Sequence, residues 1–452
     1  MPSDMSAPER RERAVRAAVE QGVVGPGTPL AGLLDITGIR ASAAALRAAF
    51  DEVTPPGTPV LHAFAVKATP LVPVLRLLYA HGGIGAEVAS PGELALARAA
   101  GVRPADTVLD SPAKTGAELR EALALGVAVN ADNLQELTRI DALVKSAAPA
   151  PSASPASPVG LRVNPQIGGG SIGALSTATA TSKFGVALRD PGAREGVVRA
   201  YLDRPWMTRL HTHSGSQGLP LELMVRGVAA AYELAEEVNA AAGRRQIDTV
   251  DIGGGLPVDF ASDTGTPTYA DYARLLKRHV PGLLDGRYGL VTEFGRSLLA
   301  KHGTVLARVE YAKTSGGRPI AVTHAGVQIA TRTVYAPESW PLRIAAYDAE
   351  GRPKPGPTVA QDVAGPACFA GDLLAENRPL PLLEQGDYAA VLDTGAYCMT
   401  AHYGYNSLGR AGIHGFTATA GGVRFGVVRP PQTFDEIVAE SGGEHADALL
   451  DF

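Results

Sequence analysis

Short apolar runs alternate with helix-like segments from about residue 36 to residue 300. Strand-like "PVLHAFAVKA" precedes helix-like "PLVPVLRLLYAHG", and the same order joins "GIGAEVAS" to "PGELALARAAG", "DTVLDSPAK" to "TGAELREALALG" and "VAVNADN" to "LQELTRIDALVKSA". Further along, "TVDIGGG" follows the helical pattern "MVRGVAAAYELAEEVNAA". This alternation predicts parallel strands joined by helical crossovers. The number of repeats favours a (β/α)8 barrel over an open sheet.

The pattern changes twice along the chain. Residues 146–158, "SAAPAPSASPASP", are low in complexity and predict a flexible loop inserted in the barrel, because "GLRVNP" resumes a strand pattern directly afterwards. After about residue 303, segments such as "GTVLARVEYAKT" and "GVRFGVVRPP" are apolar and β-branched, with few helical patterns. We therefore predict an N-terminal segment at 1–35 that packs with the β domain, a TIM-like barrel at 36–302, and a C-terminal β-sandwich or β-barrel domain at 303–452.

Composition narrows the class of protein. A net charge of −5 argues against nucleic-acid or membrane-surface partners, which favour a clustered basic face. The two cysteines cannot build a disulfide framework or a cysteine-rich zinc site, and they indicate a reducing compartment. The sequence shows neither a signal-peptide pattern nor an apolar run of about 18–20 residues. A cytoplasmic location is the expectation.

Lys67 is the first candidate for chemistry. It stands at the exit of the apolar run "LHAFAVKATP", residues 61–70, and catalytic residues of such barrels lie at the carboxyl ends of strands. A partly desolvated amine is a better nucleophile toward an aldehyde. The alternative is a lysine that extends from a strand end to solvent.

A glycine run marks a second strand end. In "DIGGGLP", Gly253, Gly254 and Gly255 allow the backbone to approach a phosphate closely and to turn its N–H groups toward it. Glycine runs also form ordinary tight turns. The run has neither the spacing of a Walker loop nor the early position of a dinucleotide fingerprint.

Two further strand ends carry polar side chains. "RLHTHSGSQG" places His211 and His213 on one side of an extended segment, followed by Ser216. The two histidines suit a metal, but no acidic or cysteine residue nearby completes a site, so no metal is expected; a histidine facing a planar cofactor fits the glycine run better. "TEFGRSLLA" adds Glu293 and Arg296, which suit a protonated ring nitrogen and a phosphate or carboxylate, or else form a surface ion pair.

The predicted β domain contains its own candidates. Cys368 lies in "AGPACFAGDLL", and Tyr397 and Tyr405 lie in "DTGAYCMTAHYGYN". A buried cysteine is most often inert packing, but the flanking glycines and proline indicate a shaped loop, in which Cys368 is as often an acid or a nucleophile as it is packing.

Together these motifs resemble the fold-type III pyridoxal-phosphate decarboxylases, the family of diaminopimelate and ornithine decarboxylases. The resemblance runs from about residue 35 to residue 430, in the family's order, through "FAVKA", "EVASPGEL", "RVNP", "SKFG", "HTHSGSQ", "DIGGGLP", "EFGR", "GPACFAGD" and "DTGAY…YN". It implies an alanine-racemase-like barrel followed by a β domain. It also implies a homodimer with active sites at its interface, in which the cysteine reaches the cofactor of the partner subunit.

The resemblance also implies a role for each matching residue. Lys67 resembles the lysine that holds pyridoxal 5'-phosphate as an aldimine, and Cys368 resembles the catalytic cysteine. The residues that match the cofactor site are Glu87, Arg162, His213, Ser216, Gly253, Gly254, Gly255, Glu293, Arg296 and Tyr397. Tyr405 matches a substrate-facing aromatic residue, and Arg296 also matches a substrate contact.

The implied reaction is decarboxylation at Cα through a quinonoid intermediate. Glu293 would keep the pyridine nitrogen protonated, so that the ring accepts the electron pair left by carbon dioxide. Related racemases instead place an arginine at that nitrogen, which makes a racemase or epimerase the weaker alternative. Cys368 is the candidate acid that returns a proton to Cα. A pseudoenzyme that regulates other proteins is less favoured still, because Lys67 and Cys368 are both present.

The chain departs from the family where the far end of the substrate is recognised. Phe369 follows the cysteine where relatives have an acidic residue, and Ala325-Gly326 replaces an aspartate-glycine pair. Burying an ammonium group without a partner costs several kcal/mol, which disfavours lysine, ornithine or diaminopimelate. "CFAGD" is similar to carboxynorspermidine decarboxylases and to decarboxylases of siderophore and natural-product pathways. We therefore expect a modified amino acid, with Arg332 and Phe369 among its contacts, and diaminopimelate as the alternative substrate.

Overall fold

The computed structural model describes residues 5–147, 156–171 and 177–450. Residues 148–155 of the predicted loop lie outside this part of the chain. The chain divides into a barrel unit, Arg40–Asp259 with Thr264–Leu298, and a sheet unit, Met1–Ile39 with Phe260–Asp263 and Leu299–Phe452. The domain boundaries inferred above stay predictions.

Eight parallel strands of the described chain close into a barrel, which confirms the predicted fold. The ring closes because β5 pairs with β6 and β2 pairs with β10. A short strand, β7, is added beside β6. The barrel strands are β2 (Val60–Ala65), β3 (Gly85–Val88), β4 (Thr107–Leu109), β5 (Ala128–Ala131), β6 (Val159–Asn164), β8 (Met207–Thr212), β9 (Thr249–Asp251) and β10 (Gly289–Thr292), and β7 is Val186–Ala187.

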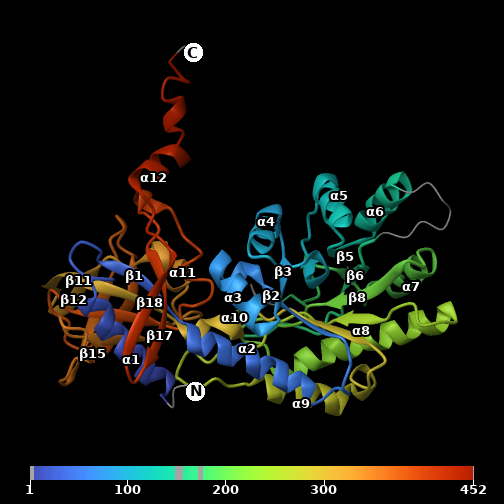
Figure 1. Cartoon of the computed structure of the whole chain (residues 1–452), viewed down its shortest axis with the longest axis horizontal. Helices are drawn as coiled ribbons and strands as arrows, with labels where there is room; N and C mark the ends of the chain where they lie inside the picture. The colour runs from blue at the N-terminus through green and yellow to red at the C-terminus, as the bar shows by residue number, and fades with distance from the viewer. Residues whose placement is uncertain (1–4, 148–155, 172–176, 451–452) are drawn as a thin grey trace. The chain divides into compact units, whose positions relative to one another are not determined.

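Helices follow the strands and surround the barrel (Figure 1). Several begin at a hydroxyl cap that accepts a backbone N–H, as at Ser90, Thr115 and Thr268, which satisfies a donor the helix itself leaves free. Their apolar sides are buried against the sheet. The helices are α2 (Ile36–Asp51), α3 (Val72–Gly82), α4 (Pro91–Ala99), α5 (Gly116–Leu125), α6 (Leu134–Ala147), α7 (Ala193–Leu202), α8 (Leu221–Ala242), α9 (Tyr269–His279) and α10 (Arg296–Leu299).

The sheet unit contains a mixed sheet that follows the order β15-β14-β12-β11-β1-β17-β18, with β16 joining β11 to β13. N-terminal β1 pairs antiparallel with β11 and parallel with β17, so the first strand of the chain lies inside a sheet built from its last third. Its strands are β1 (Leu30–Asp35), β11 (Gly303–Ser315), β12 (Arg318–Thr323), β13 (Ile344–Tyr347), β14 (Thr358–Ala364), β15 (Leu373–Pro381), β16 (Tyr388–Leu392), β17 (Gly412–Thr419) and β18 (Gly422–Arg429).

Among the described residues, the α-helices of this unit are α1 (Ala7–Glu20), α11 (Val327–Tyr335) and α12 (Phe434–Glu440). The sequence pattern predicted few helices after residue 303 and missed α11, whose sequence "VQIATRTVY" is rich in β-branched residues that disfavour helix. A tertiary contact compensates, because the buried Asp372 carboxylate accepts the N–H of Val327 at 2.6 Å. A carboxylate at a helix N-terminus is stabilising.

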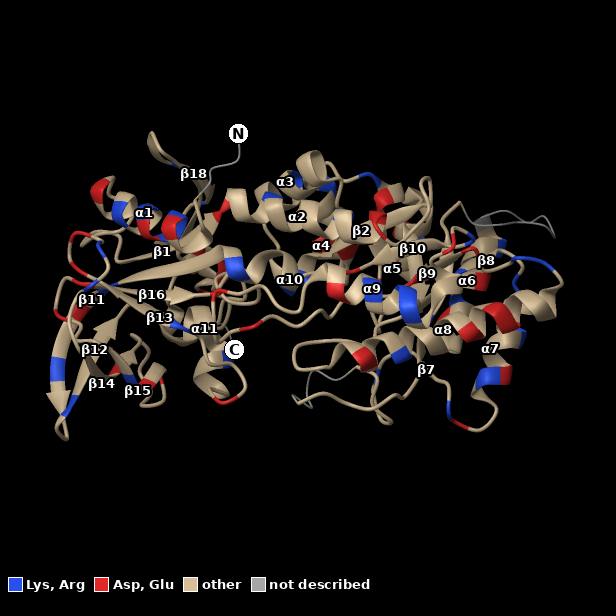
Figure 2. Ribbon diagram, turned by 90° about the horizontal axis from the view of Figure 1, so that it is seen from below, with Lys and Arg blue, Asp and Glu red and all other residues tan. Residues whose placement is uncertain are grey.

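Charges of both signs are mixed along helices such as α7 and α9 (Figure 2). Within the part of the chain that the structure describes, no helix is both long enough and apolar enough to cross a bilayer.

Candidate active site

Lys67 lies where the sequence predicts it, in a single 3-10 turn (Val66–Ala68) directly after β2. Its amine pairs with the Glu87 carboxylate of the neighbouring β3. The Lys67 side chain is 40% exposed, whereas that of Glu87 is fully buried. Burial raises the pKa of Glu87, and the Lys67 charge counteracts that rise. The pair thus places a reachable amine against an enclosed carboxylate.

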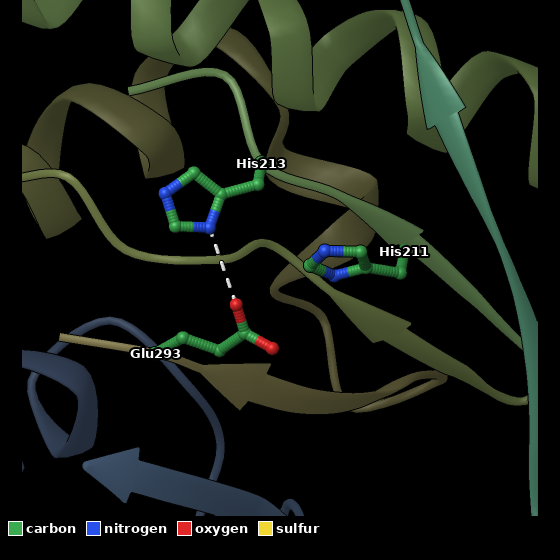
Figure 3. Close-up of side chains that lie close together, drawn as sticks. All are labelled: His211, His213 and Glu293. Atoms are coloured by element: carbon green, nitrogen blue, oxygen red, sulfur yellow. Dashed lines mark hydrogen bonds and ion pairs between the residues drawn. The ribbon is translucent and has the colours of Figure 1, made fainter. Parts of the chain in front are cut away.

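His213 and Glu293 meet at the same rim from two other strands (Figure 3). His213 Nδ1 lies 3.2 Å from Glu293 Oε2, and the other oxygen of Glu293 is buried without a hydrogen-bond partner among the described residues. Burial lowers the pKa of His213 and raises that of Glu293. A neutral histidine therefore stands beside an enclosed acid that still has an unused oxygen.

A second group of charges lies around His211. Its Nε2 is 3.1 Å from Asp110, which follows β4, and its Nδ1 is 3.2 Å from Asp251 at the end of β9. Arg162 of β6 approaches Asp110 at 3.4 Å and lies over the ring of Phe184, with its guanidinium carbon 4.4 Å from the ring centre. All three charged partners of this group are buried. Arg162 therefore pairs with an aspartate that the sequence did not single out, and its role at the cofactor stays a prediction.

The glycine run forms a tight turn that only glycine fits. Gly253 has φ +67°, donates its N–H to Asp251 at 3.0 Å and accepts the N–H of Glu293 at 2.7 Å. A Cβ at Gly254 would stand 2.1 Å from the carbonyl oxygen of Glu293, and one at Gly255 would stand 2.1 Å from the backbone of Gly215. The turn therefore packs against the loop that carries His213 and Ser216, and against the segment from Glu293 to Arg296 at the start of α10.

In the sheet unit, Cys368 is exposed on a loop that is held firmly from two sides. The N–H of Cys368 donates to Asn406 Oδ1 at 2.7 Å, and that of Ala367 donates to the buried Asp372 carboxylate at 2.7 Å. Asp372 also occupies the space beside Gly326, where a Cβ would lie 2.5 Å from its oxygens. The shaped loop inferred from the flanking glycines and proline is thus present.

Four rings make an aromatic cluster beside this cysteine: Tyr335, Phe369, Tyr403 and Tyr405. Phe369 stacks on Tyr335 with 5.9 Å between ring centres and meets Tyr405 edge-on at 5.5 Å. Tyr405 stacks on Tyr403 at 6.1 Å, and Tyr403 meets Tyr335 edge-on at 6.2 Å, so the contacts close a cycle. Phe369, which stands where relatives have an acidic residue, is therefore part of this aromatic cluster.

Arg332 and Tyr397 lie together in the same unit. The guanidinium carbon of Arg332 is 4.8 Å from the centre of the Tyr397 ring and 5.2 Å from that of Trp340. Tyr397 adopts the left-handed backbone region at φ +59°. Arg332 thus stacks on two rings, a use of the guanidinium that does not itself involve an anion.

Most of the predicted cofactor residues converge at the carboxyl rim of the barrel, whereas Cys368, Phe369, Tyr397, Tyr405 and Arg332 belong to the sheet unit. The sequence interpretation overlooked Asp110, Asp251, Tyr335 and Tyr403. For the two aspartates a signal existed, because each directly follows or ends an apolar strand, as Lys67 and Glu293 do. For the two tyrosines, the sequence offered no comparable signal.

The pyridoxal-binding domain of pyridoxal-dependent decarboxylases matches residues 39–300. The chain belongs to the family of pyridoxal-phosphate-dependent amino-acid decarboxylases. The diaminopimelate decarboxylase of Pseudomonas aeruginosa is 34% identical to it over 78% of this chain and 81% of the relative. This family membership confirms the resemblance, the enzyme class and the cofactor that the motifs predict.

Solved structures of the family share the fold of this decarboxylase. The diaminopimelate decarboxylase of M. jannaschi superposes with a TM-score of 0.80 at 25% identity, covering 94% of each chain. A lysine/ornithine decarboxylase of Vibrio vulnificus in complex with putrescine superposes with a TM-score of 0.72 at 23% identity, covering 91% of this chain and 99% of the other. The second comparison supports the fold alone.

The rim of the decarboxylase suits its cofactor. Glu293 Oε1 is buried and unused, and the turn at Gly253–Gly255 has no room for side chains. The sequence interpretation found no acidic residue close to the two histidines, but the fold brings Glu293 to within 4.8 Å of both. The three side chains are therefore close enough together for a shared ligand, which the sequence interpretation did not foresee.

Proposed function

We propose that the family's reaction takes place at this rim, with Lys67 holding the aldehyde of pyridoxal phosphate and Glu293 facing its ring nitrogen. The observation that carries the proposal is the pairing of a partly exposed Lys67 amine with buried Glu87. The pair lies at the same rim as a Glu293 oxygen that has no hydrogen-bond partner within the described part of the chain. His213 would lie against the ring, with Arg162 behind it. The glycine turn, Ser216 and Arg296 would hold the phosphate.

When bound, pyridoxal phosphate supplies an aldehyde for the substrate's amino group and a ring that takes up the electron pair left by carbon dioxide. Glu293 assists by keeping a proton at the ring nitrogen, because an anion beside a base favours the protonated base. Neutral His213 adds no positive charge there. Whenever its amine is free of the cofactor, Lys67 would be positioned by the buried Glu87 carboxylate with which it pairs.

We further propose that Cys368 donates the proton that Cα receives, and that the protein acts as a homodimer in which Cys368 serves the cofactor of the partner subunit. Support comes from the resemblance and from the exposed position of Cys368 on a loop fixed by Asn406 and Asp372. A fixed loop holds a proton donor in a defined direction, which general acid catalysis requires.

For the substrate, meso-diaminopimelate is the first candidate. The matching relatives are named diaminopimelate decarboxylase, among them those of Pseudomonas aeruginosa and Zymomonas mobilis. These names favour the alternative drawn from the sequence over its main interpretation. Since the identity to this relative is 34%, the shared substrate is a proposal that needs a test.

A second candidate is an amino acid with a bulky, uncharged or acylated side chain. Phe369 directly follows Cys368 and is built into the aromatic cluster, where relatives have an acid. Rings attract an ammonium group by about 0.5–2 kcal/mol, less than the several kcal/mol that desolvating an unpaired ammonium costs. The same surface favours apolar groups, which need no partner.

One experiment separates these substrates and tests the reaction. The protein loaded with pyridoxal phosphate is incubated in D₂O with meso-diaminopimelate, lysine, ornithine and N-acylated or citryl-linked diamino acids, and the products are weighed by mass spectrometry. Loss of carbon dioxide with one deuterium gained at Cα supports the proposal, and relative rates identify the substrate. Deuterium gained with the carboxylate retained would show racemase or epimerase chemistry and contradict the role of Glu293.

A further inference from the structure

His211 is the more deeply buried of the two histidines and makes no proposed contact with the cofactor. Its side chain is fully buried, whereas that of His213 is 14% exposed. Each of its ring nitrogens lies within ion-pair distance of a carboxylate, Asp110 on one side at 3.1 Å and Asp251 on the other at 3.2 Å, and neither nitrogen has a well-aligned hydrogen bond among the described residues. A neutral imidazole has only one N–H, so its second nitrogen would turn a lone pair toward an anion. Both contacts are favourable only when His211 is an imidazolium.

The two carboxylates are themselves held in place. Asp251 accepts the N–H of Gly253 at 3.0 Å and an amide N–H of Asn130 at 3.1 Å. Asp110 is approached by Arg162 at 3.4 Å. Neither aspartate can turn away from His211 without losing a buried partner, so the position of the imidazolium is fixed by strands on both sides.

The charged groups facing His211 are Asp110 after β4, Asp251 of β9, Glu293 after β10, His213 after β8 and Arg162 of β6. Burial acts to lower the pKa of His211, but the three carboxylates together raise it well above its usual range. The single charge of Arg162 and neutral His213 do not offset the two negative charges of Asp110 and Asp251. His211 and His213, two residues apart, thus hold opposite protonation states.

Glu293 responds to this charge. Burial raises its pKa, Asp251 and Asp110 raise it further, and His211 is the group that acts to lower it most. The ligand atoms of His211 and Glu293 lie within 4.8 Å of each other (Figure 3). Without the imidazolium, the two aspartates would form an unbalanced negative cluster that favours protonated Glu293.

We propose that His211 is a positioning residue whose permanent positive charge stabilises the carboxylate form of Glu293. The role in catalysis rests on the proposed function, in which Glu293 faces the ring nitrogen of the cofactor. A Glu293 that keeps its own proton leaves that nitrogen unprotonated and weakens the ring as an acceptor of electrons.

The first test uses the full-length protein without cofactor. Nitrogen-15 NMR of the histidine rings, assigned by comparison with His211→Gln, should show both nitrogens of His211 carrying protons up to at least pH 8. One unprotonated nitrogen of His211 at pH 7 would overturn the proposal, whatever the enzyme's substrate.

The second test follows Glu293 by carbon-13 NMR of its carboxyl group, assigned with Glu293→Gln. In His211→Gln the midpoint of the Glu293 titration should rise by about two pH units. This is the expected effect of removing one positive charge at the distance between His211 and Glu293 in a protein interior. His62→Gln is the matched control, since His62 is buried in the same barrel but contacts Thr292 and not an acid, and should leave the midpoint within about half a unit. An unchanged midpoint in folded His211→Gln contradicts the proposal.

A third test uses nitrogen-15-labelled pyridoxal phosphate to measure whether the charge of His211 affects protonation of the cofactor's ring nitrogen. The ring nitrogen should be protonated in the wild type and lose its proton at lower pH in His211→Gln. If the Glu293 midpoint shifts but the ring nitrogen does not respond in either His211→Gln or Glu293→Gln, the pairing of Glu293 with the ring is wrong while the role of His211 stands. The two failures are therefore distinguishable.

Discussion

At the scale of single residues, the proposed role of Cys368 depends on its thiol, which would donate the proton that Cα receives. Cys368→Ala should retain pyridoxal phosphate but form product at least about 100-fold more slowly, the usual contribution of a positioned general acid. The measurement is product formation in D₂O alongside the absorbance of the bound cofactor.

The second cysteine of the chain supplies the matched control for this prediction. Cys398 is partly buried, and Cys398→Ala should keep both cofactor and near-normal turnover. Cys368→Ser, which keeps a weaker acid at the same place, should fall between the two. A Cys368→Ala variant that turns over like the wild type would remove Cys368 from the reaction.

Gly254 matters because it has no side chain, which lets the turn pack closely against the backbone of Glu293. In Gly254→Ala, the new Cβ would stand 2.1 Å from the carbonyl oxygen of Glu293, so the turn must move. We expect a loss of about 1–3 kcal/mol in the free energy of unfolding, as for other overpacked sites, and weaker binding of pyridoxal phosphate. Chemical denaturation and cofactor titration measure the two effects.

Gly265→Ala is the control for Gly254→Ala, because a Cβ at Gly265 would meet nothing within 4 Å. It should leave stability and cofactor affinity nearly unchanged. If both variants behave alike, the tight packing of the glycine turn does not control cofactor binding.

At the scale of elements, β2 carries a buried histidine that makes the barrel sensitive to acid. His62 bonds to Thr292 of β10 at 2.8 Å, and burial lowers its pKa from 6.5 to about 4. Below pH 6.5 the unfolded chain therefore binds a proton at His62, whereas the folded barrel binds it only below about pH 4. The free energy of unfolding falls as the pH falls through this window. The difference amounts to about 3 kcal/mol.

His62→Gln tests this linkage, because glutamine keeps a hydrogen-bonding group at the site without titrating. Denaturation between pH 7 and pH 4 should show a loss of stability smaller by about 3 kcal/mol than in the wild type. His81→Gln removes an exposed histidine of α3 and should follow the wild-type curve. Equal pH dependence in all three proteins would contradict the assignment.

Elements also show what the sequence could predict and what it could not. The strands of the barrel follow from apolar runs of three to six residues, and Lys67 and the glycine turn follow from their places at strand ends. The meeting of Asp110, His211 and Asp251 depends on the closure of the barrel, which brings strands from distant parts of the chain together. Likewise, α11 depends on a tertiary contact to Asp372 that no local pattern reveals.

At the scale of the whole molecule, the proposed dimer predicts that two inactive variants can complement each other. If Cys368 of one subunit serves the cofactor held by Lys67 of the other, Lys67→Ala and Cys368→Ala damage different halves of the same active site. Each variant alone has two defective sites. A mixed dimer of the two has one site with both residues intact and one with neither.

Mixing the two inactive variants, after mild dissociation and reassembly, should therefore restore activity. Random exchange makes half of the dimers mixed, and each has one working site of two, so the expected recovery is about a quarter of the wild-type rate. The measurement is decarboxylation rate against mixing ratio, with the maximum at equal amounts. If reassembled mixtures contain mixed dimers by mass spectrometry but stay inactive, each active site is completed within one subunit, and the proposed sharing of Cys368 is wrong.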